Sequence, residues 1–163
     1  MTTTKAPKTT KATEATKTTK TKTAANGFLA GTPWVYTDIV KEHFLHPRNF
    51  YMGDESQYQR DGEGIVGNPI CGDQMLMMIQ VDKETDKIKD VKWKTYGCAS
   101  AIASTSALSE LAKGRTLDDA LHITAEEIEE YLGGLPKHKF HCSVLGHDAL
   151  AAAIKNYREK AAN

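Results

Sequence analysis

Residues 75–114, MLMMIQVDKETDKIKDVKWKTYGCASAIASTSALSELAKG, decide the fold. They begin with a short apolar run, which indicates a buried strand, and the polar turn KETDK follows. The next ten residues alternate Val91 and Trp93 with lysines, as a half-buried strand does. From Gly97 the apolar spacing becomes helical, and Gly114 marks a C-terminal stop. The stretch therefore predicts an antiparallel hairpin followed by a helix.

A short helix is predicted before this hairpin, in the stretch VYTDIVKEHFLHPRN. Thr37 fits its N-cap and Pro47 fits the position just beyond its end. Four of its apolar residues lie at helical spacing: Ile39, Val40, Phe44 and Leu45. The following segment, Phe50–Gly67, is polar and weakly periodic, so we expect a loop, with a possible third strand near residues 65–66.

Helices are predicted for the remainder of the chain. Thr116 and Thr124 each precede an acidic residue by three positions, as N-caps of short helices do. A final helix carries apolar residues at steps of four, namely Leu145, Ala149, Ala153 and Tyr157, with Leu150 and Ile154 beside them. The order helix, strands, helices predicts an α+β fold, in which an antiparallel sheet of about three strands is covered on one side by helices.

The first 27 residues differ in composition from the rest. They hold eleven threonines, six lysines and one acidic residue, Glu14. Such a segment cannot bury enough apolar surface to offset its chain entropy, so residues 1–27 are predicted to be disordered. Residues 28–163 then form a single domain. This domain carries more acidic than basic residues and offers no basic field for nucleic acid.

The basic, hydroxyl-rich tail raises the question of location. It lacks arginine and an apolar face, so import into a mitochondrion or a related organelle is the second interpretation, and the bacterial cytoplasm is the first. The apolar runs of the sequence, such as MLMMI and ALAAAI, are too short to span a bilayer, so no membrane association is expected.

Three cysteines fall at the boundaries of predicted elements. Cys71 precedes the first strong strand, Cys98 follows a glycine at a strand-to-helix turn, and Cys142 lies near the start of the last helix. A helix N-terminus favours the thiolate, which binds metal and attacks sulfur. Asp73 lies two positions after Cys71 and would point the same way in an extended segment, while His141 adds an imidazole. These five residues are the candidate ligands of a metal site.

The chemistry of this set indicates how firmly it would hold its cargo. Thiolates suit iron–sulfur clusters and zinc, whereas a carboxylate is a harder and poorer partner for both. A cluster held by such a mixed set should be easier to release. The spacing of the cysteines matches no compact metal motif, and free cysteines are also common as small buried hydrophobes.

Ordinary structural roles are the alternatives for several polar and sulfur-containing residues. Asp73 could cap a turn after Gly72. The methionines of the first strand are expected to fill the core rather than bind copper. Surface positions are expected for the other histidines, namely His43, His46, His122, His138 and His147. Lys137 and Lys139 would be solvated loop charges in the same reading.

Four motifs together resemble the iron–sulfur cluster assembly scaffold family, which includes the IscU proteins and the N-terminal domain of NifU. They are YTDIVKEHFLHPRN, GNPICGD, KTYGCASAIASTSALSELAKGRTLDDAL and LGGLPKHKFHCSVLGHDALAAAIKNY. They occur in the family's order and span Tyr36 to Arg158. The motifs EEYLGGLP and HCSVLG are more similar to the NifU-type branch.

The resemblance implies a function and a set of roles. The expected function is assembly of a labile [2Fe–2S] cluster from persulfide sulfur and ferrous iron, followed by transfer to apo-proteins, without enzymatic turnover. Cys71, Cys98 and Cys142 correspond to the family's cluster cysteines, and Cys142 to its persulfide acceptor. Asp73 corresponds to the aspartate that assists release, and His141 to the family's histidine. Such scaffolds can also hold Zn²⁺ at the same ligands.

The resemblance also implies partners. A cysteine desulfurase of the IscS or NifS type would supply sulfur, apo iron–sulfur proteins would receive the cluster, and a frataxin-like protein and a ferredoxin are further candidates. An Hsp70-type chaperone is less expected, because the chain has LPKHK at Leu135–Lys139 where many IscU proteins have LPPVK. The scaffold is expected to be a monomer or a dimer. The alternative is a SufU-like zinc-binding sulfur acceptor, against which the presence of His141 argues.

Overall fold

The computed structural model describes residues 36–68, 72–136 and 139–162, although the side chains of Asn68, Phe140 and His141 lie outside that description. Eight helices and strands and one 3-10 turn fill these ranges: α1 (Asp38–Leu45), η1 (Glu55–Gln57), β1 (Gly62–Asn68), β2 (Asp73–Asp82), β3 (Lys87–Tyr96), α2 (Ala99–Ala112), α3 (Leu117–Leu121), α4 (Ala125–Tyr131) and α5 (Phe140–Ala162). Within these ranges no helix combines the length and the apolar character that crossing a membrane requires.

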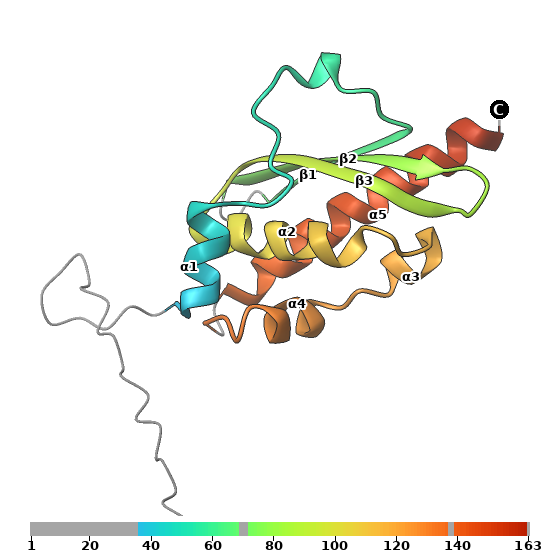
Figure 1. The fold of residues 1–163 in the computed structure, drawn as a ribbon. Helices are drawn as coiled ribbons and strands as arrows, with labels where there is room; N and C mark the ends of the chain where they lie inside the picture. Colours follow the sequence, from blue (N-terminus) through green and yellow to red (C-terminus); the bar gives the residue numbers. More distant parts are fainter. Residues whose placement is uncertain (1–35, 69–71, 137–138, 163) are drawn as a thin grey trace, which may run out of the picture. The chain divides into compact units, whose positions relative to one another are not determined.

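The sheet is antiparallel, with the strand order β1-β2-β3 (Figure 1). The predicted hairpin of β2 and β3 is confirmed, and so is the third strand near Ile65–Val66. The expectation of a loop throughout Phe50–Gly67 is wrong at its end, because β1 begins at Gly62. The α+β fold with helices on one side of a small sheet is confirmed.

Glycines explain why β1 has so weak a sequence pattern. A Cβ atom on Gly64 would lie 2.4 Å from the carbonyl oxygen of Ala149, so α5 can approach this strand only where a side chain is missing. Asn156 of α5 accepts a hydrogen bond from the backbone N–H of Glu63 at 3.1 Å, which satisfies one donor of the edge strand. Close packing against a helix therefore replaces the apolar alternation expected of a strand.

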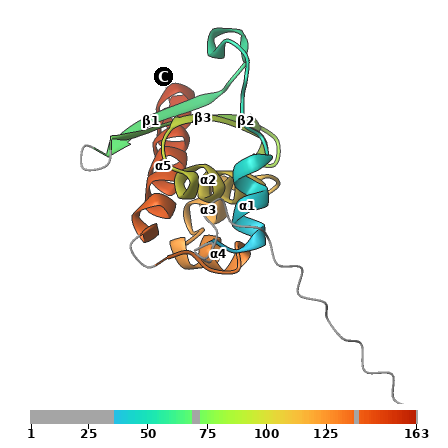
Figure 2. The same ribbon diagram turned by 90° about the vertical axis from the view of Figure 1, so that its left-hand side faces the viewer.

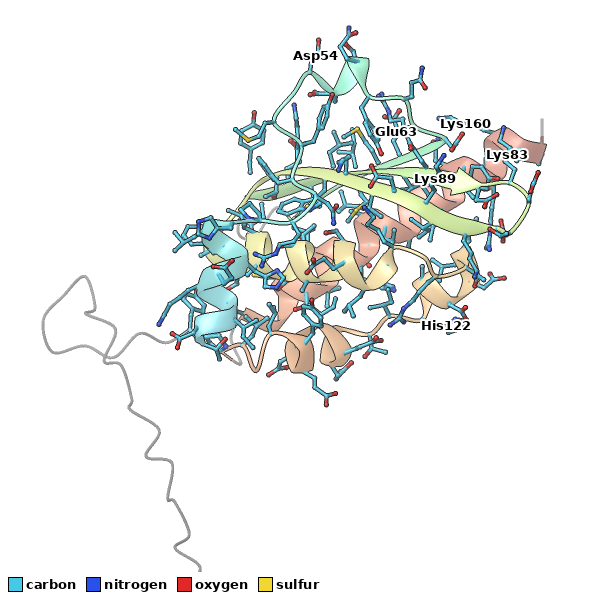
Figure 3. All side chains as sticks on the ribbon, in the orientation of Figure 1. Asp54, Glu63, Lys83, Lys89, His122 and Lys160 are labelled. Carbon is cyan, nitrogen blue, oxygen red and sulfur yellow. The ribbon has the colours of Figure 1, made fainter. Side chains whose placement is uncertain are left out.

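Helices α2 and α5 lie beneath the sheet, and α3 and α4 lie farther from it (Figure 2). The inner face of β2 contributes Met75 and Met77 to the core, as expected of the methionines. Met78 points to the opposite face and is also fully buried. The loop between α1 and β1 crosses that outer face, and Figure 3 shows Asp54 at its far end. Tyr58 of this loop donates a hydrogen bond to Asp90 of β3 at 2.9 Å, which attaches the loop to the sheet.

Helix α1 begins where the sequence predicts. The Thr37 hydroxyl accepts a hydrogen bond from the backbone N–H of Val40 at 3.1 Å, as an N-cap does. Of the four apolar residues at helical spacing, however, only Val40 is buried, whereas Ile39, Phe44 and Leu45 are exposed. The apolar spacing therefore does not mark the buried face of this helix.

The buried face of α1 includes a histidine. His43 is 4% exposed, so the expectation that it lies on the surface is wrong. Its Nδ1 lies 2.8 Å from the hydroxyl oxygen of Ser106, which also accepts the backbone N–H of Arg48. When Nδ1 of the neutral ring carries no proton, the serine hydroxyl can donate to it while its oxygen accepts from Arg48. Burial, followed by the charge of Arg48, lowers the pKa of His43 and keeps the ring neutral.

The expectation of a surface position holds for some of the remaining histidines but not for all of them. His46 and His122 are exposed, as expected, and Figure 3 shows His122 just after α3. His147 is only half-buried, and its Nε2 lies 3.0 Å from the carbonyl oxygen of Leu121. His138 lies outside the described residues.

The short helices α3 and α4 start at the predicted caps. Thr116 accepts the backbone N–H of Asp119, and Thr124 accepts that of Glu127, each at 3.1 Å. The predicted final helix is α5, and its N-terminal turn carries Cys142.

Candidate functional site

Three chain segments meet at the end of the sheet that lies opposite the β2–β3 turn (Figure 1). Asp73 is the first residue of β2, Cys98 directly precedes α2, and Cys142 is the third residue of α5. One ligand atom from each of these side chains lies within 4.8 Å of the others. The fold therefore brings together three of the five side chains that the sequence singles out.

Cys98 occupies the N-cap of α2 in an extended conformation. Ordinary N-caps carry a short oxygen-bearing side chain, whereas Cys98 places a sulfur atom at this position. Its thiol is half-buried and free of any disulfide. The sulfur therefore stands at the positive end of the helix, where a negative charge is stabilised.

Cys142 faces Cys98 from the other helix. The two sulfur atoms lie 3.5 Å apart, within the range of a hydrogen bond between thiols. Cys142 is 0% exposed, and its neighbour Ser143 donates a hydrogen bond to Ser104 of α2 at 3.3 Å. This contact joins the first turn of α5 to α2 and holds the two cysteines in register.

The pair shares its protons unequally. The hydrogen bond from the Cys142 thiol lowers the pKa of Cys98 to about 5, and the backbone N–H of Ala101 and the charge of Lys139 act in the same direction. The pKa of Cys142 is raised, first because it donates that hydrogen bond and then because it is buried beside a negative sulfur. The shared proton therefore favours the thiolate form at Cys98 and the thiol form at Cys142.

Asp73 is 7% exposed, and its Oδ2 atom has no hydrogen-bond partner among the residues that the structure describes. A buried carboxylate oxygen without a partner is costly, and buried charges are normally paired or bound to metal. Its neighbours in the cluster are the two sulfur atoms, and the thiolate of Cys98 adds a second negative charge beside it. A cation between the three side chains would offset all of these charges at once.

A glycine that sequence reasoning did not assign to the site leaves space for the side chain of Asp73. A Cβ atom on Gly97 would lie 3.3 Å from the Asp73 carboxyl carbon and 3.1 Å from the hydroxyl oxygen of Thr95, closer than such contacts normally are. The position just before Cys98 therefore leaves room for the carboxylate. In the sequence, the position of Gly97 next to Cys98 was the only indication that it belongs to the site.

Lys139 is the second residue whose role the sequence left open. The interpretation as a solvated loop charge misses its effect on the site, because its positive charge adds to the lowering of the Cys98 pKa and partly offsets the raising of the Cys142 pKa. Lys137 lies outside the described residues.

The donor set fits a thiophilic metal. Two sulfurs and one carboxylate oxygen suit zinc or the irons of an iron–sulfur cluster, and both leave room for further ligands. Cys71 lies outside the described residues, and so does the side chain of His141. Their part in the ligand set stays a prediction from the sequence.

Comparison with known proteins gives two close relatives. The family described as NifU-like N terminal domain matches residues 35–163. The chain is 50% identical over 127 residues to the nitrogen fixation protein NifU of Nostoc sp. (strain PCC 7120 / SAG 25.82 / UTEX 2576). The matched region covers 77% of this chain but only 42% of that protein. It is 48% identical over 126 residues to the iron-sulfur cluster assembly scaffold protein IscU 1 of Archaeoglobus fulgidus, covering 77% of this chain and 78% of that protein.

A solved structure shares the fold. The crystal structure of a nitrogen-fixing NifU-like protein (N-terminal) from Brucella abortus superposes with a TM-score of 0.61 over 77% of this chain and 96% of that one. The two sequences are 18% identical, so this likeness concerns the arrangement of helices and strands alone.

Proposed function

Because the chain belongs to the NifU-like N-terminal domain family, we propose that it is a scaffold on which a labile [2Fe–2S] cluster is assembled and then passed to apo-proteins. The observation that carries this proposal is the buried Oδ2 of Asp73, which lies beside two sulfurs and has no hydrogen-bond partner within residues 36–68, 72–136 and 139–162. A carboxylate is a weak ligand for the irons of a cluster, which suits cargo that must leave.

The side chains divide the work in this proposal. Cys98 and Cys142 supply two of the sulfur ligands, and Cys71 would supply the third. Asp73 neutralises part of the iron charge during assembly and is displaced when the cluster is released, whereas His141 completes the set. The chain contributes ligands and charge, and it is not expected to act as an enzyme.

The partners follow from the cargo. Sulfur would come from a cysteine desulfurase as a persulfide held by Cys142, iron would enter as Fe²⁺, and apo iron–sulfur proteins would receive the product. A frataxin-like protein and a ferredoxin are candidates for assistance in assembly. Whether Leu135–Lys139 recruits an Hsp70-type chaperone is open to a direct binding test with a peptide of that sequence.

Anaerobic reconstitution tests the proposal. The full chain, a cysteine desulfurase, L-cysteine and Fe²⁺ should together give the visible charge-transfer absorption of a [2Fe–2S] centre. Omission of the desulfurase should abolish early colour formation. A colourless protein that retains iron without sulfide would contradict the proposal.

A zinc-binding sulfur acceptor is the second candidate. Two thiols and one carboxylate also make an acceptable zinc site with an open fourth position. In that case the protein would retain one zinc per chain throughout the reconstitution, and it would raise the turnover of the desulfurase without becoming coloured. Loss of zinc as colour develops would exclude the zinc-binding sulfur acceptor and support the scaffold proposal.

Location belongs to the same proposal. We place the protein in the bacterial cytoplasm, with import through the basic tail as the alternative. A fluorescent protein fused behind residues 1–35 would report this directly, because import predicts its accumulation in the organelle and a cytoplasmic protein predicts diffuse signal.

A further inference from the structure

We propose that sulfur enters the site on Cys98 and moves from there to Cys142, so that the two cysteines form a relay rather than two equivalent ligands. The inference rests on the proposed function, because it assumes that the chain accepts persulfide sulfur. It assigns Cys98 a role as the receiving site, and Cys142 the role of the holding site.

Access distinguishes the two sulfurs. Cys98 is half-buried and precedes α2 at an exposed turn, where both Tyr96 and Gly97 are exposed. Cys142 is 0% exposed. A protein-bound persulfide must bring its outer sulfur into contact with the attacking sulfur, and of the two cysteines that the structure describes only Cys98 offers a surface for that contact. The turn of α5 that carries Cys142 is joined to α2 by the buried hydrogen bond from Ser143 to Ser104.

Distance makes the second step possible. The sulfurs of Cys98 and Cys142 are 3.5 Å apart, so a sulfur carried by Cys98 lies beside Cys142 from the moment it is bound. The added S–S bond is about 2 Å long. Rotation about the Cα–Cβ bond of Cys98, whose side chain borders solvent, gives the room that this extra atom needs.

The chemistry is two successive thiol exchanges. First, the Cys98 thiolate attacks the outer sulfur of the desulfurase persulfide, a Cys98–sulfur bond forms, the donor S–S bond breaks, and the donor cysteine leaves as a thiolate. Second, Cys142 attacks the same sulfur, the bond to Cys98 breaks, and its electron pair returns to Cys98 together with the Cys142 proton. The transferred sulfur keeps its own proton. Neither step requires an oxidant or a reductant.

The direction of transfer has a physical benefit. A persulfide on half-buried Cys98 can be stripped by any small thiol in solution, whereas one on Cys142 is shielded. The relay thus moves sulfur from the accessible cysteine to the protected cysteine within the cluster of Asp73, Cys98 and Cys142.

Digestion with trypsin allows a time course on the unsubstituted full chain. Cleavage after lysine and arginine places Cys71, Cys98 and Cys142 in separate peptides, covering residues 61–83, 95–113 and 140–155. The chain is mixed anaerobically with a desulfurase and L-cysteine, quenched with an alkylating agent, and analysed by mass spectrometry. The added sulfur should appear first in peptide 95–113 and later in peptide 140–155. Simultaneous appearance, or appearance in 140–155 first, overturns the relay.

Two variants give the same test a second form. Cys142→Ser should retain sulfur on Cys98, and Cys98→Ser should reduce the initial rate of labelling at Cys142 at least about tenfold, because the intramolecular route is lost. Val144→Ala is the matched control, since Val144 lies in the same turn of α5 with its side chain exposed, and it should retain the order of labelling. Unchanged labelling of Cys142 in Cys98→Ser contradicts the proposal even if that variant is less stable.

Inorganic polysulfide as a second donor separates the relay from the proposed function. If the desulfurase labels no cysteine while polysulfide labels Cys98 before Cys142, the relay is supported and the scaffold proposal fails. If both donors label the chain but Cys98→Ser changes nothing, the relay alone is wrong.

Discussion

The sulfur atoms of Cys98 and Cys142 lie 3.5 Å apart, although 44 residues separate them in the sequence. One begins α2 and the other lies in the first turn of α5, so the contact depends on the packing of two helix N-termini against each other. A thiol and a thiolate share a proton there, and Asp73 adds a carboxylate.

The first prediction concerns the reactivity of Cys98 with pH. Because the thiol of Cys142 stabilises the Cys98 thiolate, the pKa of Cys98 is lowered to about 5. Alkylation of Cys98 by iodoacetamide should therefore be nearly constant above that pKa and fall as the pH drops through it. Peptide mass spectrometry measures this site by site. A midpoint near an ordinary thiol pKa of about 8.5 would contradict the shared proton.

Substitution of Asp73 by asparagine should stabilise the metal-free protein. The carboxylate oxygen that lacks a partner in the described part of the chain is buried beside the Cys98 thiolate, and burying a charge without a partner costs more than burying a neutral amide. Asp73→Asn removes the charge at nearly constant shape, so we expect the free energy of unfolding in urea to rise by about 1 kcal/mol. The exposed Asp148→Asn is the matched control and should leave it unchanged. A destabilised Asp73→Asn protein would mean that the carboxylate has a partner.

Removal of the same side chain should slow cluster release. In Asp73→Ala the cluster loses its one weak ligand, so we expect assembly to continue and the rate of transfer to an apo-ferredoxin to fall about tenfold, a barrier increase of about 1.4 kcal/mol. Stopped-flow absorption of the two proteins follows the transfer. Equal transfer rates in both scaffolds would remove Asp73 from the release step.

A glycine in β1 should be essential for the packing of α5. In Gly64→Ala the new methyl group would lie 2.4 Å from the carbonyl oxygen of Ala149, and overpacking of this kind costs about 1–3 kcal/mol. Gly67→Ala lies on the same strand, but its methyl group would be 3.8 Å from its nearest neighbour, the carbonyl oxygen of Asp73. Urea denaturation should therefore separate the two variants clearly. Equal stabilities would show that α5 does not approach β1 so closely.

Acid should destabilise the protein partly through His43. Its pKa is lowered in the folded state by burial, so the unfolded chain binds the proton first as the pH falls below about 6.5. The free energy of unfolding then declines until the pH reaches the lowered folded value. His43→Gln should reduce this decline between pH 7 and pH 5.5, whereas His46→Gln, at an exposed position, should not. An unchanged decline in His43→Gln would show that His43 is protonated in the folded protein.

The sequence predicts the central elements because their apolar spacing reflects the core directly. β2, β3 and α2 bury the residues that their periodicity selects, such as Met75, Trp93 and Leu108. It fails for β1, since Gly62 and Gly64 serve close contact with a helix and show no alternation. The sequence pattern also fails to identify the buried face of α1. That face carries His43, which contacts Ser106 of α2.

Some features of the site could likewise be predicted from the sequence, and others could not. The boundary positions of Cys98 and Cys142 are visible in the sequence, because a glycine and a helix start mark them. Their distance and unequal burial are not, since both depend on how α2 packs against α5. The space that Gly97 leaves for Asp73 is likewise a property of the folded turn.

Transfer in the presence of a chelator tests the central claim most directly. The scaffold is loaded with its [2Fe–2S] cluster, and apo-ferredoxin is added together with an excess of an iron chelator that stays in solution. The account predicts that the scaffold loses its colour while holo-ferredoxin forms at the same rate with or without the chelator. Retention of the cluster by the scaffold, or capture of its iron by the chelator with no holo-ferredoxin, would contradict it.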